Sequence, residues 1–80
     1  MDIKYSSHAV ERMIQRNITP QEVDIIVTDP DGAIKQSQDK FIYYKKIKYR
    51  GDNLLAAVTV QKKRAVLEVI TVMINFEVKK

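Results

Sequence analysis

Three side chains near the start of the chain have the types and the spacing for metal-free chemistry on a phosphodiester. His8, Arg12 and Arg16 lie four residues apart. This spacing places them along one stripe of an α-helix, drifting about 40° at each step. A neutral imidazole can accept a proton from a ribose 2′-hydroxyl, and guanidiniums can bind a phosphate and stabilise the charge that develops on it. We therefore predict His8 as a general base and the two arginines as its phosphate-binding partners.

The same residues also allow a purely structural interpretation. A histidine in the first turn of a helix is often only a surface residue, and the two arginines can pair with Glu11, Gln15 or another neighbour. The spacing alone leaves both interpretations open.

Composition excludes several other kinds of site. The chain has no cysteine and one histidine, which excludes disulfides, thiol catalysis and metal centres built from several histidines or cysteines. Its only glycines are Gly32 and Gly51, too few for a glycine-rich phosphate loop. We expect neither a metal nor a cofactor.

The charge is unevenly distributed. Residues 1–34 contain three basic and six acidic side chains, whereas residues 35–80 contain eleven basic and four acidic ones. The basic part favours a polyanionic partner, although lysines also serve solubility and protect sheet edges. With 45% hydrophobic and 30% charged residues, the 80-residue chain is expected to form one globular domain over residues 1–80, located in the cytoplasm.

A basic, aromatic segment follows the middle of the chain. In an extended strand, alternate residues share a face, and four such residues combine an aromatic ring with cations: Tyr44, Lys46, Lys48 and Arg50. Bases can stack on the ring while the cations hold phosphates, so we predict these four as RNA-binding residues. Tyr43 and Tyr49 are expected to face the core instead.

Two helices are predicted in the first third of the chain. The first follows the capping serines 6 and 7, carries the apolar residues Ala9, Val10, Met13 and Ile14, and ends at Arg16-Asn17. The second begins with Thr19 as cap, Pro20 in the first turn and Glu22 completing a capping box, and residues 29–32 (DPDG) end it.

From Ala33 onward the apolar pattern changes to a period of two, which predicts strands at residues 33–37, 40–49, 54–61 and 66–75. Their short connections favour an antiparallel meander. The predicted fold is α+β, with two N-terminal helices packed on a four-stranded antiparallel sheet. We expect the helices to cover the more apolar face and the other face to present Tyr44, Lys46, Lys48, Thr59 and Thr71.

Residues 7–23 read SHAVERMIQRNITPQEV, and an aromatic segment (FIYY, 41–44) and a terminal VITV segment (69–72) follow. This pattern resembles small bacterial and phage domains that are similar to the RelE/ParE and BrnT toxins of type II toxin–antitoxin modules, with the barnase–colicin–RelE type of nuclease fold. The resemblance implies a toxin-type, metal-independent endoribonuclease with an antitoxin partner. It places the catalytic residues at His8, Arg12 and Arg16 and adds Thr71 of the last strand.

Two other functions remain open at this point. One is a non-catalytic module that binds protein or nucleic acid, including as a homodimer. The other is a ParE-like inhibitor of a protein target. One fold hosts many functions, so the choice depends on where the named side chains lie.

Overall fold

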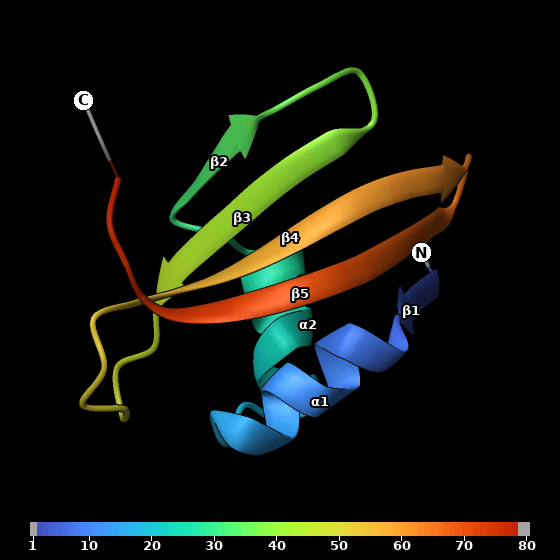
Figure 1. The fold of residues 1–80 in the computed structure, drawn as a ribbon. Helices are drawn as coiled ribbons and strands as arrows, with labels where there is room; N and C mark the ends of the chain where they lie inside the picture. Colours follow the sequence, from blue (N-terminus) through green and yellow to red (C-terminus); the bar gives the residue numbers. More distant parts are fainter. Residues whose placement is uncertain (1, 79–80) are drawn as a thin grey trace.

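A computed structural model describes residues 2–78 of the chain. It contains two helices and five strands (Figure 1). In chain order these are β1 (Asp2–Tyr5), α1 (Ser7–Gln15), α2 (Pro20–Thr28), β2 (Gly32–Lys35), β3 (Lys40–Lys46), β4 (Leu54–Lys63) and β5 (Val66–Phe76).

The sheet has the strand order β1-β5-β4-β3-β2. β2 to β5 form the expected antiparallel meander, but β1 pairs in parallel with the N-terminal half of β5. The predicted four-stranded antiparallel sheet is therefore wrong, and the sheet is five-stranded and mixed. The four residues of β1 directly precede α1, and the strand with which they pair lies more than 60 residues away in the sequence. A local pattern does not reveal such a pairing.

The predicted helix ends are confirmed. The side chain of Ser6 accepts a 3.0 Å hydrogen bond from the Ala9 N–H at the start of α1. Asn17, just beyond that helix, has a φ of 53°, the left-handed conformation that asparagine tolerates. Thr19 and Glu22 form the capping box of α2. These local signals fix where both helices begin.

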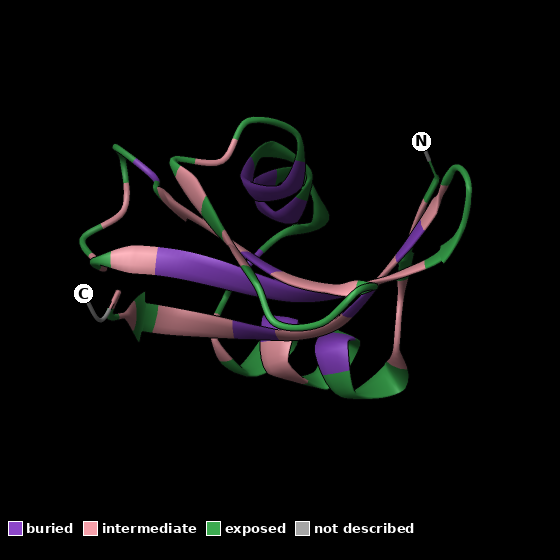
Figure 2. Cartoon of the chain, turned by 90° about the horizontal axis from the view of Figure 1, so that it is seen from above, coloured by how far each residue is buried: buried purple, intermediate pink, exposed green. Residues whose placement is uncertain are grey.

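Both helices contribute to one core on the same side of the sheet. α1 packs against β5 and is seen below it in Figure 1, whereas α2 packs against β3 and β4 and passes behind the sheet in that view. The middle of β4 is buried, while the turns and the outer surfaces of the helices are exposed (Figure 2). The core cluster consists of Ala9, Met13, Ile18, Val23, Ile26, Val27, Ile47, Leu55, Ala57, Leu67, Val69 and Val72.

The other face of the sheet carries a second apolar cluster and no helix. Ile42, Ala56 and Val58 are buried there beneath the partly exposed side chains of Ile34, Tyr44, Ile70, Met73 and Phe76. Thr71 lies directly opposite Val58 in the pairing of β4 with β5. The prediction for Thr59 is wrong, because this residue lies opposite Val69 and is fully buried, with its hydroxyl donating to the Phe41 carbonyl at 3.2 Å.

The alternation along β5 is interrupted in its middle. Val69 and Val72 both belong to the core on the helix side, although three positions separate them. The pairing of β4 with β5 shifts between Val58 and Thr59, at this same place. A β-bulge of this kind reverses which residues face the core beyond it. The alternation predicted for residues 66–75 therefore holds as far as Ile70 and fails beyond it.

No helix among the described residues is both long enough and apolar enough to span a membrane.

Candidate functional site

The structure brings together two of the three side chains of the predicted catalytic stripe. The Nε of Arg12 donates to the Nε2 of His8 at 3.4 Å, and an Nη of Arg12 donates to the Oε1 of Gln15 at 2.8 Å. His8 is exposed on the outer surface of α1. Neither His8 nor Arg12 lines any of the three hollows described below. The pair is therefore an open surface contact.

Arg16 does not join this pair. Its Nη1 donates a 2.6 Å hydrogen bond to the carbonyl of Val72 in β5. Nearby, the hydroxyl of Ser6 donates to the carbonyl of Ile70 at 3.1 Å. β1 pairs with β5 only as far as Val69, so these two side chains satisfy carbonyls along the edge of β5 that β1 leaves uncovered. In this structure Arg16 joins helix to sheet.

Thr71 lies beside Val72 in sequence but belongs to the helix-free face, where it is opposite Val58. His8 and Arg12 lie on the outer surface of α1, which packs against β5 from the side that contains Val69 and Val72. The four predicted catalytic residues therefore form one contacting pair, one structural arginine and one threonine on the helix-free face.

The predicted RNA-binding set is divided as well. Tyr44 lies on the helix-free face, where its ring contacts that of Phe76 at a centroid distance of 5.8 Å. The ring also covers Gly32: a Cβ added to that glycine would lie 2.9 Å from Cε1 of Tyr44 and closer still to the end of the ring. Tyr44 is thus a packing residue of the second cluster.

Arg50 fixes the β3–β4 loop (residues 47–53) to the start of α2. Its guanidinium lies 3.2 Å from the carboxylate of Glu22 and 2.6 Å from that of Asp52, and it also donates to the backbone carbonyls of Arg16 and Asn17. The side chain is 14% exposed and that of Glu22 is 4% exposed. So many internal partners leave Arg50 a structural role, contrary to its predicted role in RNA binding.

Tyr49 was missed by the sequence prediction and is the most exposed large hydrophobic side chain among residues 2–78, at 75%. The predicted strand at residues 40–49 would have turned it toward the core. β3 instead ends at Lys46, and Arg50 N–H bonds to the Ile47 carbonyl at 3.1 Å to close a turn that directs Tyr49 outward. Gly51, Asp52 and Asn53 predict a turn from the sequence. The loop extends back to residue 47, however, because of the contacts of Arg50.

The hydroxyl of Tyr49 donates a 2.7 Å hydrogen bond to Oε2 of Glu22. This hydrogen bond, together with burial and the negative charge of Glu22, raises the pKa of Tyr49. Burial alone would raise the pKa of Glu22, but hydrogen bonds from Thr19 and Tyr49 and the charge of Arg50 outweigh it and hold that pKa below its ordinary value. The exposed ring is therefore held at its hydroxyl by an ionised, nearly buried carboxylate.

A hollow of about 370 Å³ lies between α2 and the end of β3, and we call it the Tyr49 hollow. Lys45 is bound by Asp29 and Asp31, each at 3.5 Å, and Asp31 also accepts from the Lys46 N–H at 2.8 Å. Lys48 is exposed at the mouth of the same hollow. The hollow is lined by Ile25, Asp31, Lys45, Lys46, Ile47, Lys48 and Tyr49.

A family model described as a domain of unknown function (DUF4258) matches residues 5–74. The chain belongs to this family. The resemblance to the RelE/ParE and BrnT toxins is thereby corrected, and the toxin and antitoxin roles that it implied lose their support. The residues that suggested it, such as Thr19, Pro20 and Glu22, build helix ends that many folds share. No curated protein and no solved structure matches this DUF4258 chain significantly.

Proposed function

We propose that this DUF4258 chain binds single-stranded RNA at the Tyr49 hollow. The observation that supports this most directly is an aromatic ring that is 75% exposed and yet tied by its hydroxyl to Glu22. Exposing an aromatic ring to water costs free energy. A ring beside lysines offers a stacking surface to an unpaired base. A base stacked on such a ring contributes about 1–3 kcal/mol to binding.

The tether of Tyr49 to Glu22 supports stacking for a second reason. A free side chain loses rotational freedom when a base packs against it, and this loss opposes binding. The hydrogen bond to Glu22 restricts the ring before the ligand arrives. Glu22 is itself held by Arg50 and by the capping box, so the ring is attached to a rigid part of the fold.

The lysines of the hollow provide the second half of the proposed interaction. The charge of Lys45 is offset by Asp29 and Asp31. The ammonium group of Lys46 donates to the backbone carbonyl of Asp52, and its charge also helps to lower the pKa of the Asp52 carboxylate. Lys48 extends from the loop beside Tyr49. A phosphate next to the stacked base would meet Lys46 and Lys48, two of the cations that the sequence predicted for RNA binding.

Binding of a fluorescent single-stranded oligoribonucleotide tests this proposal. Replacing Tyr49 with alanine is expected to weaken binding by about 5- to 150-fold, which corresponds to the loss of one stacked base. Tyr49→Phe keeps the ring but loses the hydrogen bond to Glu22, so its RNA affinity should lie between those of the wild type and Tyr49→Ala. Lys48→Ala should reduce the slope of log affinity against log salt concentration by about 1.

Lys63→Ala is the matched control, since it removes the same charge at the far end of β4, away from the hollow. It should weaken binding much less than Lys48→Ala. Absence of RNA binding by the wild type, or equal affinity for the wild type and Tyr49→Ala, would overturn the proposal. A fully paired duplex of the same sequence should bind more weakly, because its bases are already stacked.

Metal-independent cleavage of RNA is retained as a second proposal, because the 3.4 Å contact between Arg12 and His8 keeps a base and a cation together. Incubation of RNA with the protein and a chelator tests it directly. Cleavage that persists in the chelator and disappears in His8→Ala would support it, and intact RNA would reject it. His8→Ala is expected to leave affinity at the Tyr49 hollow unchanged, since His8 lies on α1 and lines no part of that hollow.

A further inference from the structure

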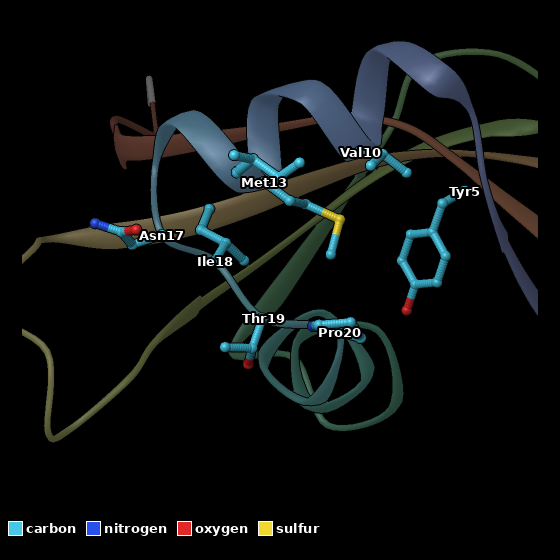
Figure 3. Close-up of a pocket in the computed structure, with 8 residues that line it drawn as sticks. Tyr5, Val10, Met13, Asn17, Ile18, Thr19 and Pro20 are labelled. Carbon is cyan, nitrogen blue, oxygen red and sulfur yellow. The ribbon is translucent and has the colours of Figure 1, made fainter.

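An apolar groove runs between the two helices, on the opposite side of α1 from His8 and Arg12. Figure 3 shows it along α1, with Tyr5 toward one end, Asn17 toward the other and Met13 and Ile18 between them. Its volume is about 500 Å³, and no charged side chain belongs to its lining. The lining residues, which define the interhelical groove, are Tyr5, Val10, Met13, Ile14, Asn17, Ile18, Thr19 and Pro20.

Two large aliphatic side chains of the groove are exposed. Ile14 is 72% exposed and Val10 is 44% exposed, whereas Ala9 and Met13 of the same predicted apolar stripe are buried. The amphipathic face of α1 is therefore wider than the surface that β5 covers. An exposed apolar strip beside a hollow is typical of a surface that binds another molecule.

On the α2 side, the groove adjoins a hollow that contains one acidic side chain, Asp24. This hollow of about 380 Å³ shares Pro20 with the groove and continues along α2 past Gln21 to Asp24 and Ile25. Burial raises the pKa of the Tyr5 hydroxyl, and the negative charge of Asp24 raises it further. The apolar strip is thus continuous with a hollow that carries one negative charge, that of Asp24.

The groove lies along α1, so the length of this helix indicates how long a bound segment would be. α1 has nine residues, which at about 1.5 Å each span about 13 Å. An amphipathic helix laid along the groove would contact it with apolar side chains at positions i, i+3, i+4 and i+7. Cations on the flank of that helix would face Asp24.

We infer that the interhelical groove binds a basic amphipathic helical segment of another protein. Apolar side chains of the segment pack between Val10, Ile14 and Pro20, and a lysine or arginine on its flank pairs with Asp24. Two copies of this chain are a poorer match, because neither the groove nor the adjoining hollow contains a lysine or arginine that could pair with Asp24 of the other copy. This interaction is separate from RNA binding at the Tyr49 hollow.

Designed helical peptides of about 15 residues, long enough to form a helix in isolation, test this inference. One peptide places leucines on one face and lysines on its flanks, a second replaces the lysines with glutamates, and a third scrambles the order of the first. Anisotropy of labelled peptides should show binding of the first, with the other two at least about tenfold weaker.

Two variants identify the surface. Ile14→Ser removes an exposed apolar side chain with little effect on folding and should weaken binding of the lysine peptide by about tenfold. Asp24→Asn should weaken binding of the lysine peptide and leave the glutamate peptide unaffected. Tyr49→Ala should leave peptide binding unchanged, which separates this groove from the Tyr49 hollow.

Equal binding of the lysine and glutamate peptides, or equal binding by the wild type and Ile14→Ser, would overturn the inference. So would a concentration-dependent dimer that Ile14→Ser abolishes, because the occupant of the groove would then be a second copy of the chain.

Discussion

Arg50 and Glu22, 28 positions apart in the sequence, form the ion pair that fastens the β3–β4 loop to the first turn of α2. Both side chains are largely removed from solvent, and each has further partners: Asp52 and two carbonyls for Arg50, and Thr19 and Tyr49 for Glu22. The pair therefore links the position of the exposed Tyr49 ring to the helix layer.

Removal of Arg50 is expected to be strongly destabilising. Arg50→Ala leaves Glu22 as a nearly buried charge without its cation, which should lower the free energy of unfolding by about 3 kcal/mol. Arg50→Lys keeps the charge but loses the fork geometry and should fall between Arg50→Ala and the wild type. Urea denaturation measures both, with Lys48→Ala as the exposed control. If Arg50→Ala proves as stable as that control, the loop does not depend on this pair.

Stability should depend on pH through Glu22. Its pKa in the folded protein lies below the ordinary value of 4.5, so its contribution to stability is fully present above pH 4.5 and is lost as the pH falls through the folded-state pKa. Glu22→Gln removes this contribution, and the wild type should exceed it by about 1.5–3 kcal/mol at neutral pH.

Urea denaturation of the wild type and of Glu22→Gln at a series of pH values measures this effect. The difference in unfolding free energy between the two proteins should shrink as the pH is lowered below 4.5. A difference that stays constant down to pH 2.5–3, about 1.5–2 units below that value, would show that ionisation of Glu22 does not stabilise the fold.

The two glycines provide a matched pair of substitutions. A Cβ at Gly32 would overlap the ring of Tyr44, whereas a Cβ at Gly51 would meet nothing within 4 Å. Gly32→Ala is therefore expected to lower the melting temperature, through a loss of about 1–3 kcal/mol, and Gly51→Ala to leave it almost unchanged. Thermal unfolding followed by circular dichroism compares them, and equal melting temperatures would refute the close approach of Tyr44 to β2.

Replacing Arg16 and replacing Arg12 should affect stability differently, although both residues belong to the predicted catalytic stripe. Arg16 binds the Val72 carbonyl at the edge of β5, and Arg12 contacts only exposed side chains of its own helix. Loss of a hydrogen bond from a charged donor costs about 1.5–3 kcal/mol, so Arg16→Ala should be destabilised by that amount. Arg12→Ala should stay within about 0.5 kcal/mol of the wild type. Equal stability of the two variants would show that the contact of Arg16 with β5 does not stabilise the fold and that Arg16 is available to bind a ligand.

The features that sequence predicted correctly are those encoded by neighbouring residues. Thr19, Pro20 and Glu22 lie within four positions, and the capping box that they form needs nothing from the rest of the chain. The antiparallel order of β2 to β5 follows from short connections for the same reason.

The features that were missed depend on distant partners. β1 is a strand only because Leu67 and Val69 offer an edge, and Arg50 turns inward because Glu22, Arg16 and Asn17 surround its guanidinium. The exposure of Tyr49 follows from that inward turn, so the ring proposed to bind RNA was expected in the core. Alternation within β5 was lost at a bulge, whose position depends on how two strands pair.

The parallel pairing of β1 with β5 also determines when β1 and α1 can assemble on the sheet during synthesis. Residues 2–5 are synthesised more than 60 residues before the strand that they join. Until Val66 to Val69 have emerged, Ile3 and Tyr5 have no sheet to pack on, and α1 has no β5 beneath it. Assembly of β1 and α1 on the sheet must therefore wait until β5 has been made, and a chain truncated before Val66 would lose the surface that α1 covers together with β5 itself.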